Sequence, residues 1–272
     1  YSRFFMKALA FENNKFKYTE PFESLFTQGM VCHETYKNEK NQWLYPEDVE
    51  KNPKGILVSK KDQNKVHVGS SEAMSKSKKN IVDPETMIDV YGADSIRWFM
   101  LSDSPPERDV QWSTEGVSAS FKFIQKLWKL NYEISNKKNS DLKSGDILLK
   151  KSVNKTIYNV TKNLDNFQYN VVVANIHEVY NLFTQHLKDN NTSNDVLKNE
   201  WEKITMILVP LIPHLAYECN EKINKDLYWP KFNPKLLEEE NCNIVVQVDG
   251  KKRGILEMPM NSQEKTIINK SK

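Results

Sequence analysis

The chain has 272 residues, of which 39% are hydrophobic and 28% are charged, and its formal net charge at pH 7 is +3. These proportions are ordinary for a soluble globular protein, and so mild a charge does not by itself indicate a nucleic-acid-binding protein. The sequence has no signal peptide and no apolar run of about 18 residues, so membrane insertion is not expected.

The three cysteines, Cys32, Cys219 and Cys242, lie far apart in the chain and are odd in number. Neither a disulfide framework nor a zinc-ligand spacing follows from them, and no metal site is predicted. A reducing cytosol is the simplest compartment for such a chain, so we expect a cytoplasmic protein.

The first predicted element is a helix in YSRFFMKALAF, which begins at Tyr1 without a methionine and suggests a piece of a longer protein. The stretch EPFESLF (residues 20–26) predicts one or two helical turns. GMVCHETY predicts a strand that follows a break at Gly29. Residues 36–70 are polar around the short apolar run 56–58, and we expect a small excursion there with little core of its own.

Residues 72–80, EAMSKSKKN, place three lysines and two serines on a short stretch without glycine. Ammonium groups on a mobile loop suit the neutralisation of triphosphate charge that grows while a bond breaks. Lys76 would act as a point charge, and Ser75 and Ser77 would offer hydroxyl donors. The glycine-rich phosphate cradle G-x-x-x-x-G-K-[ST] is absent. Composition alone leaves another interpretation open, a solvated basic loop or a nuclear-import-like patch.

Two short helices are predicted after this stretch. Asp83 and Pro84 form a favourable helix start, since Asp83 can accept hydrogen bonds from free N–H groups and proline suits the first helical position. Gly92 separates this helix from a second one, whose apolar residues recur over 96–100. The break at 104–106 (Ser-Pro-Pro) ends the first region of the chain.

From about 114 to 227 the apolar residues recur with helical spacing, and the loops between the periodic segments are short and polar. This pattern predicts an antiparallel helical bundle. The run 171–173 (three valines) favours a strand by propensity, but the spacing around it favours a helix. The predicted helices cover 121–134, 147–165, 169–187 and 195–225, the last kinked at Pro210 and Pro213.

The tail alternates apolar and polar residues on both sides of Asp249-Gly250, which is the strongest short signal for a β-hairpin. An isolated hairpin is only marginally stable. We therefore expect this hairpin to open a further domain.

Several segments together resemble one known family. AMSKSKKN (73–80) resembles the KMSKS loop of class I aminoacyl-tRNA synthetases, and KNIVDPETMIDVYGADSIRWFML (79–101) is similar to the segment that follows it. SPPERDVQWSTEGVSASFKFIQKLWKL (104–130) resembles the bacterial type of leucyl-tRNA synthetase in particular. YSRFFMKAL, EPFESLFTQGMV and NIVVQVDGKKRG look like the same family, so the resemblance covers nearly the whole chain.

The resemblance implies an α/β plus all-α fold. Residues 1–103 would form the C-terminal half of a Rossmann-like catalytic domain. Residues 104–238 would form an antiparallel helical bundle of the anticodon-binding type, and 239–272 would begin a small β-containing C-terminal domain.

The family's roles carry over position by position. Lys76 matches the catalytic lysine that contacts ATP and stabilises the transition state, and Met74, Ser75 and Ser77 match loop positions beside the nucleotide. Ala73 stands where the family usually has the first lysine, which puts that lysine's share of phosphate binding in doubt. Lys78, also assigned to the nucleotide, or Lys79 could compensate in part.

Other residues receive structural interpretations or two competing ones. Asp94 and Arg97, in YGADSIR, are expected to brace the loop rather than to react. His214 is expected to pack in the bundle, and the six tryptophans to serve core and interface packing. Residues 251–253 (Lys251, Lys252 and Arg253) are either a charged turn that keeps a sheet edge soluble or a tRNA phosphate contact.

The implied activity is that of a leucine-tRNA ligase that forms leucyl-adenylate from leucine and ATP with Mg²⁺. The leucyl group would pass to the 3′ adenosine of tRNA(Leu), and we expect a monomer. The family's HIGH motif does not occur in the chain. The chain is therefore expected to be a C-terminal portion that is inactive alone.

Two alternatives remain. One is a free-standing RNA-binding module that uses the bundle and the basic loop without catalysis. The other is a sister synthetase for isoleucine, valine or methionine.

Overall fold

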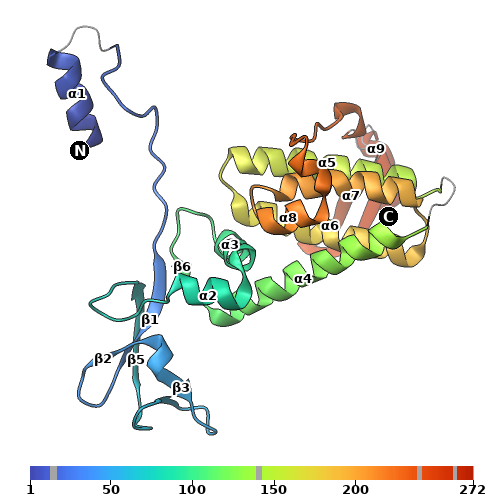
Figure 1. Ribbon diagram of the computed structural model, residues 1–272. Coiled ribbons are helices and arrows are strands. Elements are labelled where there is room, and N and C mark those ends of the chain that lie inside the picture. Colours follow the sequence, from blue (N-terminus) through green and yellow to red (C-terminus); the bar gives the residue numbers. More distant parts are fainter. Residues whose placement is uncertain (13–16, 139–142, 238–240, 260–261, 272) are drawn as a thin grey trace. The chain divides into compact units, whose positions relative to one another are not determined.

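The computed structural model describes residues 1–12, 17–138, 143–237, 241–259 and 262–271 (Figure 1). The chain divides into two compact units. The sheet unit comprises residues 1–82 and 106–112, and the helical unit comprises residues 83–105 and 113–272. Residues 83–105 thus cluster with the helices, so the compact units do not follow the sequence boundary predicted at 103.

The sheet unit is built around β1 (Val31–Lys37), which confirms the strand predicted after Gly29. β1 pairs antiparallel with β2 (Trp43–Leu44) and β5 (His67–Ala73), and parallel with β6 (Val110–Gln111). A Cβ added at Gly29 would lie 2.1 Å from the backbone oxygen of Arg108. Glycine is therefore required where the chain enters β1, because the 106–109 backbone passes directly against it.

The excursion between β1 and β5 consists of short elements. β2 is followed by a 3₁₀ turn, η1 (Pro46–Asp48), and by the antiparallel pair β3 (Val49–Lys51) and β4 (Leu57–Ser59). Val58 and Val66 are each 4% exposed and supply its buried hydrophobic side chains. The expected small core is confirmed.

The N-terminal helix is confirmed as α1 (Ser2–Glu12), but the short helix predicted at 20–26 is wrong. That segment has no helical hydrogen bonding, and its apolar side chains are exposed, Phe22 by 68% and Leu25 by 87%. A helix of one or two turns is unstable without packing. Forming its first turn costs the conformational entropy of several residues and gains only one hydrogen bond. Glu20 of this segment instead accepts two hydrogen bonds from Arg3, at 2.7 and 2.8 Å.

The helical unit begins with the two helices predicted after the lysine-rich stretch. α2 (Pro84–Tyr91) starts at Asp83, whose carboxylate accepts a hydrogen bond from the Glu85 N–H at 3.2 Å. Gly92, with φ +79°, separates α2 from α3 (Ala93–Ser102). Glycine adopts this backbone conformation without the steric cost that a Cβ would bring.

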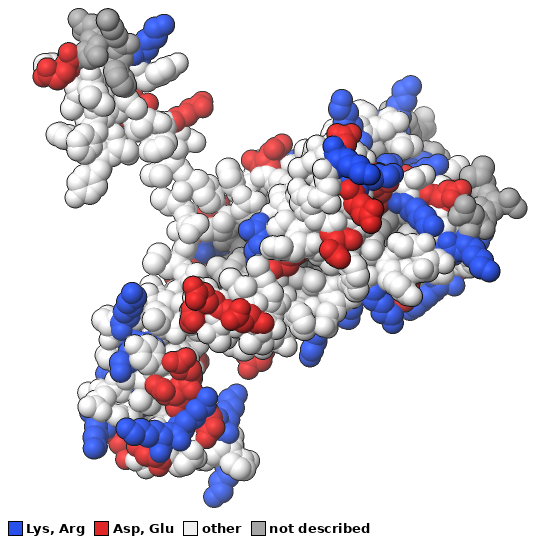
Figure 2. Space-filling model, viewed as in Figure 1, with Lys and Arg blue, Asp and Glu red and all other residues white. Residues whose placement is uncertain are grey.

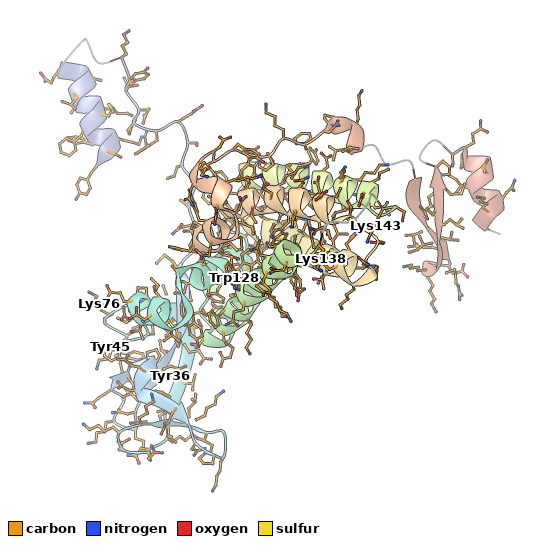
Figure 3. All side chains as sticks on the ribbon, turned by 45° about the vertical axis from the view of Figure 1, so that its right-hand side comes forward. Tyr36, Tyr45, Lys76, Trp128, Lys138 and Lys143 are labelled. Atoms are coloured by element: carbon orange, nitrogen blue, oxygen red, sulfur yellow. The ribbon has the colours of Figure 1, made fainter. Side chains whose placement is uncertain are left out.

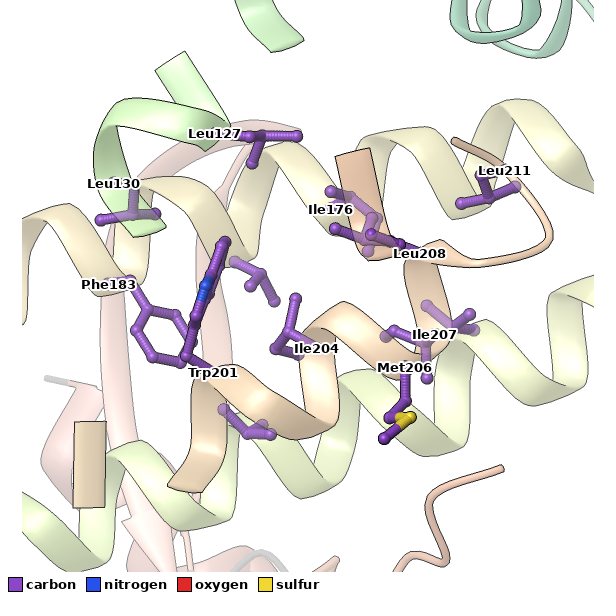
Figure 4. Packing of buried hydrophobic residues seen from close by; sticks show 14 of the residues in the cluster. Leu127, Leu130, Ile176, Phe183, Trp201, Ile204, Met206, Ile207, Leu208 and Leu211 are labelled. Atoms are coloured by element: carbon purple, nitrogen blue, oxygen red, sulfur yellow. The ribbon is translucent and has the colours of Figure 1, made fainter. Parts of the chain in front are cut away.

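Helical spacing also predicted the bundle. Its long helices are α4 (Thr114–Asn136), α5 (Asp146–Asp165), α6 (Tyr169–Asp189) and α7 (Asn194–Leu208). The three-valine run lies inside α6, where Val172 and Val173 are buried, so helical spacing outweighed strand propensity. Figure 4 shows Phe183, Trp201 and Ile204 packed in the core, and each is at most 4% exposed.

The prediction of a single kinked helix over 195–225 is wrong, because the helix is interrupted. The structure has two helices, α7 and α8 (Pro213–Cys219), followed by a 3₁₀ turn, η2 (Glu221–Asn224). Proline has no N–H to donate and clashes with the preceding turn, so Pro210 and Pro213 end one helix and begin the next.

Asp94 and Arg97 hold this corner between α7 and α8. Arg97 donates from Nε to the carbonyl of Leu211 at 2.8 Å and from Nη2 to that of Pro210 at 2.7 Å. Asp94 is 7% exposed, and its carboxylate accepts from the N–H of Leu215 at 2.7 Å. Both residues are structural, as predicted, but these contacts brace the helix corner and not the lysine-rich loop.

His214 differs from its prediction. Its side chain is 75% exposed instead of packed in the bundle, and its Nδ1 lies 2.9 Å from the Asp94 carboxylate. The His214 ring therefore lies on the surface, next to the Asp94 carboxylate.

Asp146 joins the starts of two bundle helices. The side chain is 4% exposed, and its carboxylate accepts from the N–H of Ser193 at 2.7 Å, the hydroxyl of Ser193 at 2.8 Å and the N–H of Lys143 at 3.1 Å. Burial alone would raise the pKa of this carboxyl, but these hydrogen bonds favour the charged form and leave the pKa below its ordinary value.

The predicted hairpin is confirmed as β7 (Asn241–Val248) and β8 (Lys251–Pro259), which pair antiparallel. Its turn residues Asp249 and Gly250 both have positive φ, 53° and 74°, as a two-residue type I′ turn requires. A 3₁₀ turn, η3 (Pro234–Leu236), precedes the hairpin and α9 (Glu264–Ser271) follows it.

Two further expectations concern the cysteines and the membrane. Cys32 and Cys219 are free thiols, and the Cys242 side chain lies outside the described residues. Burial, with the nearby Glu218, raises the pKa of the Cys219 thiol to about 12. Across the described ranges, no helix has both the length and the apolar character needed to cross a bilayer.

Candidate functional site

The lysine-rich loop (residues 74–80) leaves the end of β5 in the sheet unit. Met74 is tied to the neighbouring strand because its N–H donates to the carbonyl of Val31 at 2.9 Å. The loop then turns tightly, with the N–H of Lys79 donating to the carbonyl of Lys76 at 3.3 Å and Lys79 at φ 54°. The residues predicted to meet a nucleotide are thus presented on one turn that is anchored to the sheet.

One buried side chain holds the base of this loop. Asn80 is fully buried, and its Oδ1 accepts from the N–H of Ser75 at 2.9 Å. Its Nδ2 donates to the carbonyls of His33 at 3.1 Å and Glu72 at 3.0 Å. The side chain therefore joins the first turn of the loop to both β1 and β5.

The three ammonium groups of the loop have different surroundings. Lys78 forms an ion pair with Glu72, and Lys79 lies over the ring of Tyr45 with its Nζ 5.0 Å from the ring centroid. Lys76 is exposed, and within the described parts of the chain its ammonium has no hydrogen bond or ion pair. Figure 3 labels Lys76 and also Tyr45, the residue over whose ring Lys79 lies. Lys76 is thus the loop cation available to a ligand.

The hydroxyl groups flank this cation. The Oγ atoms of Ser75 and Ser77 lie 3.3 Å apart, and the Ser75 hydroxyl accepts weakly from the N–H of Lys78 at 3.4 Å. Ser77 is exposed, whereas Met74 and Ser75 are half-buried. An exposed ammonium beside two hydroxyls is a donor set suited to phosphate oxygens.

Ala73, at the end of β5, is exposed and pairs with Cys32 across the sheet. The suggestion that Lys78 or Lys79 compensates for the missing lysine meets an obstacle in this structure. Both side chains already have partners, in Glu72 and in Tyr45. Either ammonium would have to leave its partner before it could contact a phosphate.

Sequence reasoning assigned no role to three residues that shape this loop, Asn80, Glu72 and Tyr45. Asn80 and Glu72 lie inside the lysine-rich stretch 72–80, but a polar residue type does not show which groups it will contact. The only available signal was a lone asparagine at the end of a lysine-rich turn, directly before a helix start.

The basic residues of the hairpin lie at its turn. Lys251, Lys252 and Arg253 begin β8 and are all exposed. They form a basic group beside the type I′ turn. On the face seen in Figure 2, basic and acidic side chains are mixed over the sheet unit, as expected from the small net charge.

Trp128 departs from the packing role expected of the tryptophans. Trp98 and Trp201 are 2% and 4% exposed, but Trp128 on α4 is 45% exposed. Tyr132, one helical turn further on, is 64% exposed, and Lys129 between them is exposed as well. Two aromatic rings with an adjacent cation make a surface on which unpaired bases can stack.

Two family models each match a part of the chain. Residues 66–113, which include the whole lysine-rich loop, match the family described as tRNA synthetases class I (I, L, M and V). Residues 146–268 match the anticodon-binding domain of tRNA ligase. The chain therefore contains one segment similar to class I tRNA synthetases and one similar to the anticodon-binding domain of tRNA ligases.

The individual relatives are leucine–tRNA ligases. The chain is 37% identical to the leucine–tRNA ligase of Azorhizobium caulinodans, covering 95% of the chain and 32% of that protein. It is 38% identical to the one from Orientia tsutsugamushi, covering 98% of the chain and 32% of that protein. The chain is thus homologous to leucine–tRNA ligases over nearly its whole length, which confirms the predicted resemblance. It spans about a third of the length of these relatives.

A solved structure bears out the fold class. The crystal structure of the ternary complex of Agrobacterium radiobacter K84 agnB2 LeuRS, tRNA and LeuAMS matches 99% of this chain and 31% of that chain, with a TM-score of 0.68 and 22% identity. The predicted combination of an α/β part and a helical part is therefore confirmed.

Proposed function

We propose that the protein containing this chain is a leucine–tRNA ligase of class I. It would use ATP to convert leucine into leucyl-adenylate and then transfer the leucyl group to the 3′ adenosine of tRNA(Leu). The observation that carries this proposal is the exposed ammonium of Lys76, which has no ion pair or hydrogen bond among the described residues, on an anchored loop in a chain 37% identical to such ligases.

In the proposed reaction a carboxylate oxygen of leucine forms a bond to the α-phosphorus of ATP. The bond from that phosphorus to the bridging oxygen breaks, and pyrophosphate leaves with the electron pair. Lys76 would be the catalytic residue, since its ammonium can neutralise charge that develops on the leaving pyrophosphate. Ser75 and Ser77 would donate to phosphate oxygens, Met74 would line the adenosine side, and Lys78 would contribute after release from Glu72.

ATP fits the donor set of this loop, and Mg²⁺ is proposed as its counter-ion. In the described part of the chain, no group of three histidine, cysteine, aspartate or glutamate side chains could hold a metal ion. Mg²⁺ commonly enters nucleotide sites bound to the substrate phosphates and keeps several waters. We propose that it reaches this protein as Mg·ATP.

The proposed partners are leucine and tRNA(Leu). Lys251, Lys252 and Arg253 would contact tRNA phosphates, and their exposure beside the hairpin turn supports this role. Trp128 and Tyr132 on α4 offer a second RNA surface through base stacking. We further propose a cytoplasmic monomer without membrane contact, which light scattering and cell fractionation can test.

The sequence boundaries also remain a proposal. Residues 1–103 would belong to the catalytic domain, 104–238 to the bundle and 239–272 to a C-terminal domain. Limited proteolysis with mapped fragments tests these boundaries, since cleavage concentrates in exposed connections.

The decisive experiment is leucine-dependent ATP–pyrophosphate exchange by the full-length protein that carries this chain. Lys76→Ala should lower kcat at least ~100-fold, the scale for removing a transition-state donor. Lys54→Ala, an exposed lysine at a turn of the sheet unit, is the matched control and should leave exchange within about twofold of wild type. Normal exchange by the Lys76 variant would refute the proposed catalytic role.

The same assay separates the other candidates. An RNA-binding module without catalysis would show no exchange, and Lys76→Ala would cause only a small, salt-dependent loss of RNA affinity. The exposed Trp128 and Tyr132 are the observation that keeps this candidate in view. A sister ligase would exchange with isoleucine, valine or methionine in preference to leucine.

A further inference from the structure

The lysine-rich loop contains one residue whose side chain faces inward. Residues 74–79 are exposed or half-buried, whereas Asn80 is 0% exposed. A primary amide has two N–H donors and a carbonyl acceptor, so its burial is costly unless they are satisfied. In this structure both ends of the amide are satisfied, and each partner is a backbone group of the sheet unit.

The partners come from three separate segments. The carbonyl of His33 belongs to β1, the carbonyl of Glu72 belongs to β5, and the N–H of Ser75 begins the loop. A further long contact joins Asn80 Nδ2 to the carbonyl of Ala73 at 3.5 Å. The amide therefore fixes the distance between the start and the end of the turn, and it fixes both to the sheet.

This fixation bears directly on Lys76. Ser75, the residue whose N–H is held, immediately precedes Lys76, and the Lys76 carbonyl accepts the hydrogen bond that closes the turn. The Lys76 side chain itself makes no hydrogen bond within the described residues. The backbone of the turn therefore sets the position from which the Lys76 side chain extends, and Asn80 holds that backbone against the sheet.

We propose that Asn80 is a positioning residue, whose buried amide holds the turn over 75–79 in the form that presents the Lys76 ammonium to the reacting phosphate. This inference rests on the catalytic role proposed for Lys76. Because Asn80 is fully buried, it would act through the loop backbone and not on the substrate directly. The shape of the amide is specific to the task, because an aspartate of the same size would face two carbonyl oxygens with a negative charge.

The first test is a double-mutant cycle in the full-length protein that carries this chain. Asn80→Ala should lower kcat for leucine-dependent pyrophosphate exchange about 10- to 100-fold, with little change in the KM for leucine, since small misplacements of a catalytic group have effects of this size. In a Lys76→Ala background the same change should lower kcat less than about threefold, because the two residues act as one unit. Equal effects in both backgrounds would overturn the proposal.

The second test uses a pH profile. Burial against two carbonyl oxygens should raise the pKa of the carboxyl introduced by Asn80→Asp. The variant should therefore approach wild-type exchange as pH falls, since the protonated carboxyl donates one hydrogen bond and accepts another, while the ionised form repels the facing carbonyls. The measured quantity is the ratio of variant to wild-type kcat between about pH 8 and pH 5.5. Wild-type exchange by Asn80→Asp at pH 8, where the ionised carboxylate cannot donate, would contradict the proposed donor role.

A matched control and an independent readout complete the design. Asn154 is 7% exposed and hydrogen-bonds the backbone of Asn233 in the helical unit, so Asn154→Ala should leave exchange within about threefold of wild type. Tryptic cleavage at Lys76, Lys78 or Lys79 should be faster in Asn80→Ala than in wild type, whatever the enzyme catalyses. If Lys76→Ala does not impair exchange, the proposed function fails, and the cleavage rates still decide whether Asn80 holds the loop.

Discussion

The lysine-rich loop and the helical bundle are held in place by different kinds of interaction. In the bundle, large apolar side chains such as Phe183, Ile204 and Leu208 are fully buried, and packing density determines their positions. In the loop the buried element is a single amide, and the residue of functional interest is exposed. Stability should therefore respond to changes in the bundle, and catalysis to changes in the loop.

The largest expected effect on stability lies in the bundle core. Ile204→Ala should lower the free energy of unfolding by about 4 kcal/mol, because the lost methyl and methylene contacts leave a cavity that neighbouring helices fill incompletely. Urea denaturation followed by circular dichroism at 222 nm measures this change. Lys126→Ala, on the exposed side of α4, is the control and should change stability by less than about 0.5 kcal/mol.

A loss below 1 kcal/mol for Ile204→Ala would contradict the comparison, because it would place Ile204 outside the tightly packed core. The slope of unfolding free energy against urea should stay the same in both variants. A changed slope would mean that the bundle no longer unfolds as one unit.

A smaller effect is expected at Asp146, where the bundle depends on polar contacts. Asp146→Asn should lower the free energy of unfolding by about 2 to 3 kcal/mol, since an amide cannot accept all three hydrogen bonds that the carboxylate accepts. The measurement is urea denaturation at pH 7. Stability equal to wild type would show that the join between the helix starts does not need the charge.

The pKa of Asp146 gives this prediction a pH dependence. The folded-state pKa lies below the ordinary value of the carboxyl, about 3.9. A lowered pKa means that the charged carboxylate stabilises the fold fully above the unfolded-state pKa and loses this effect as pH falls through the folded-state pKa. The difference between wild type and Asp146→Asn should therefore be constant from pH 7 to about 5 and should shrink below about pH 4.

The smallest stability effects are expected in the loop. Lys78→Ala removes the ion pair with Glu72, whose side chains are 39% and 37% exposed, and should cost at most about 1 kcal/mol. Lys76→Ala should leave the free energy of unfolding within about 0.5 kcal/mol of wild type. Denaturation and pyrophosphate exchange measured on the same samples would sharpen the comparison. A Lys76 variant that lost stability and exchange together would remove the distinction between the two regions.

Much of the helical unit could be predicted from sequence because the information is local. Spacing of apolar residues indicated α4, α5 and α6, and Asp249-Gly250 indicated the hairpin turn. The failures were short elements, such as the helix expected at 20–26, whose formation depends on packing. The split between α7 and α8 was predicted only as a kink, since the sequence does not show whether neighbours rescue a proline-interrupted helix.

The candidate site divides in the same way. The order of residues in the loop forms a recognisable motif, so the sequence was enough to predict Lys76, Ser75 and Ser77 as nucleotide-binding residues. The contacts that shape the loop join residues far apart, as with Asn80 and His33, which are 47 positions apart. Such pairings depend on how β1 and β5 come together, and no local spacing encodes them.

The corner between α7 and α8 determines which charge is needed at positions 94 and 97. Arg97 meets carbonyl oxygens of the turn that directly follows α7, and Asp94 meets N–H groups at the start of α8. The partial charges at the two helix ends are opposite, so each brace residue has a required sign. Exchanging the two residues would preserve composition, net charge and helical propensity almost unchanged, yet it would set like charge against like at both ends. The order aspartate first, arginine three residues later, is therefore the part of YGADSIR that this corner requires.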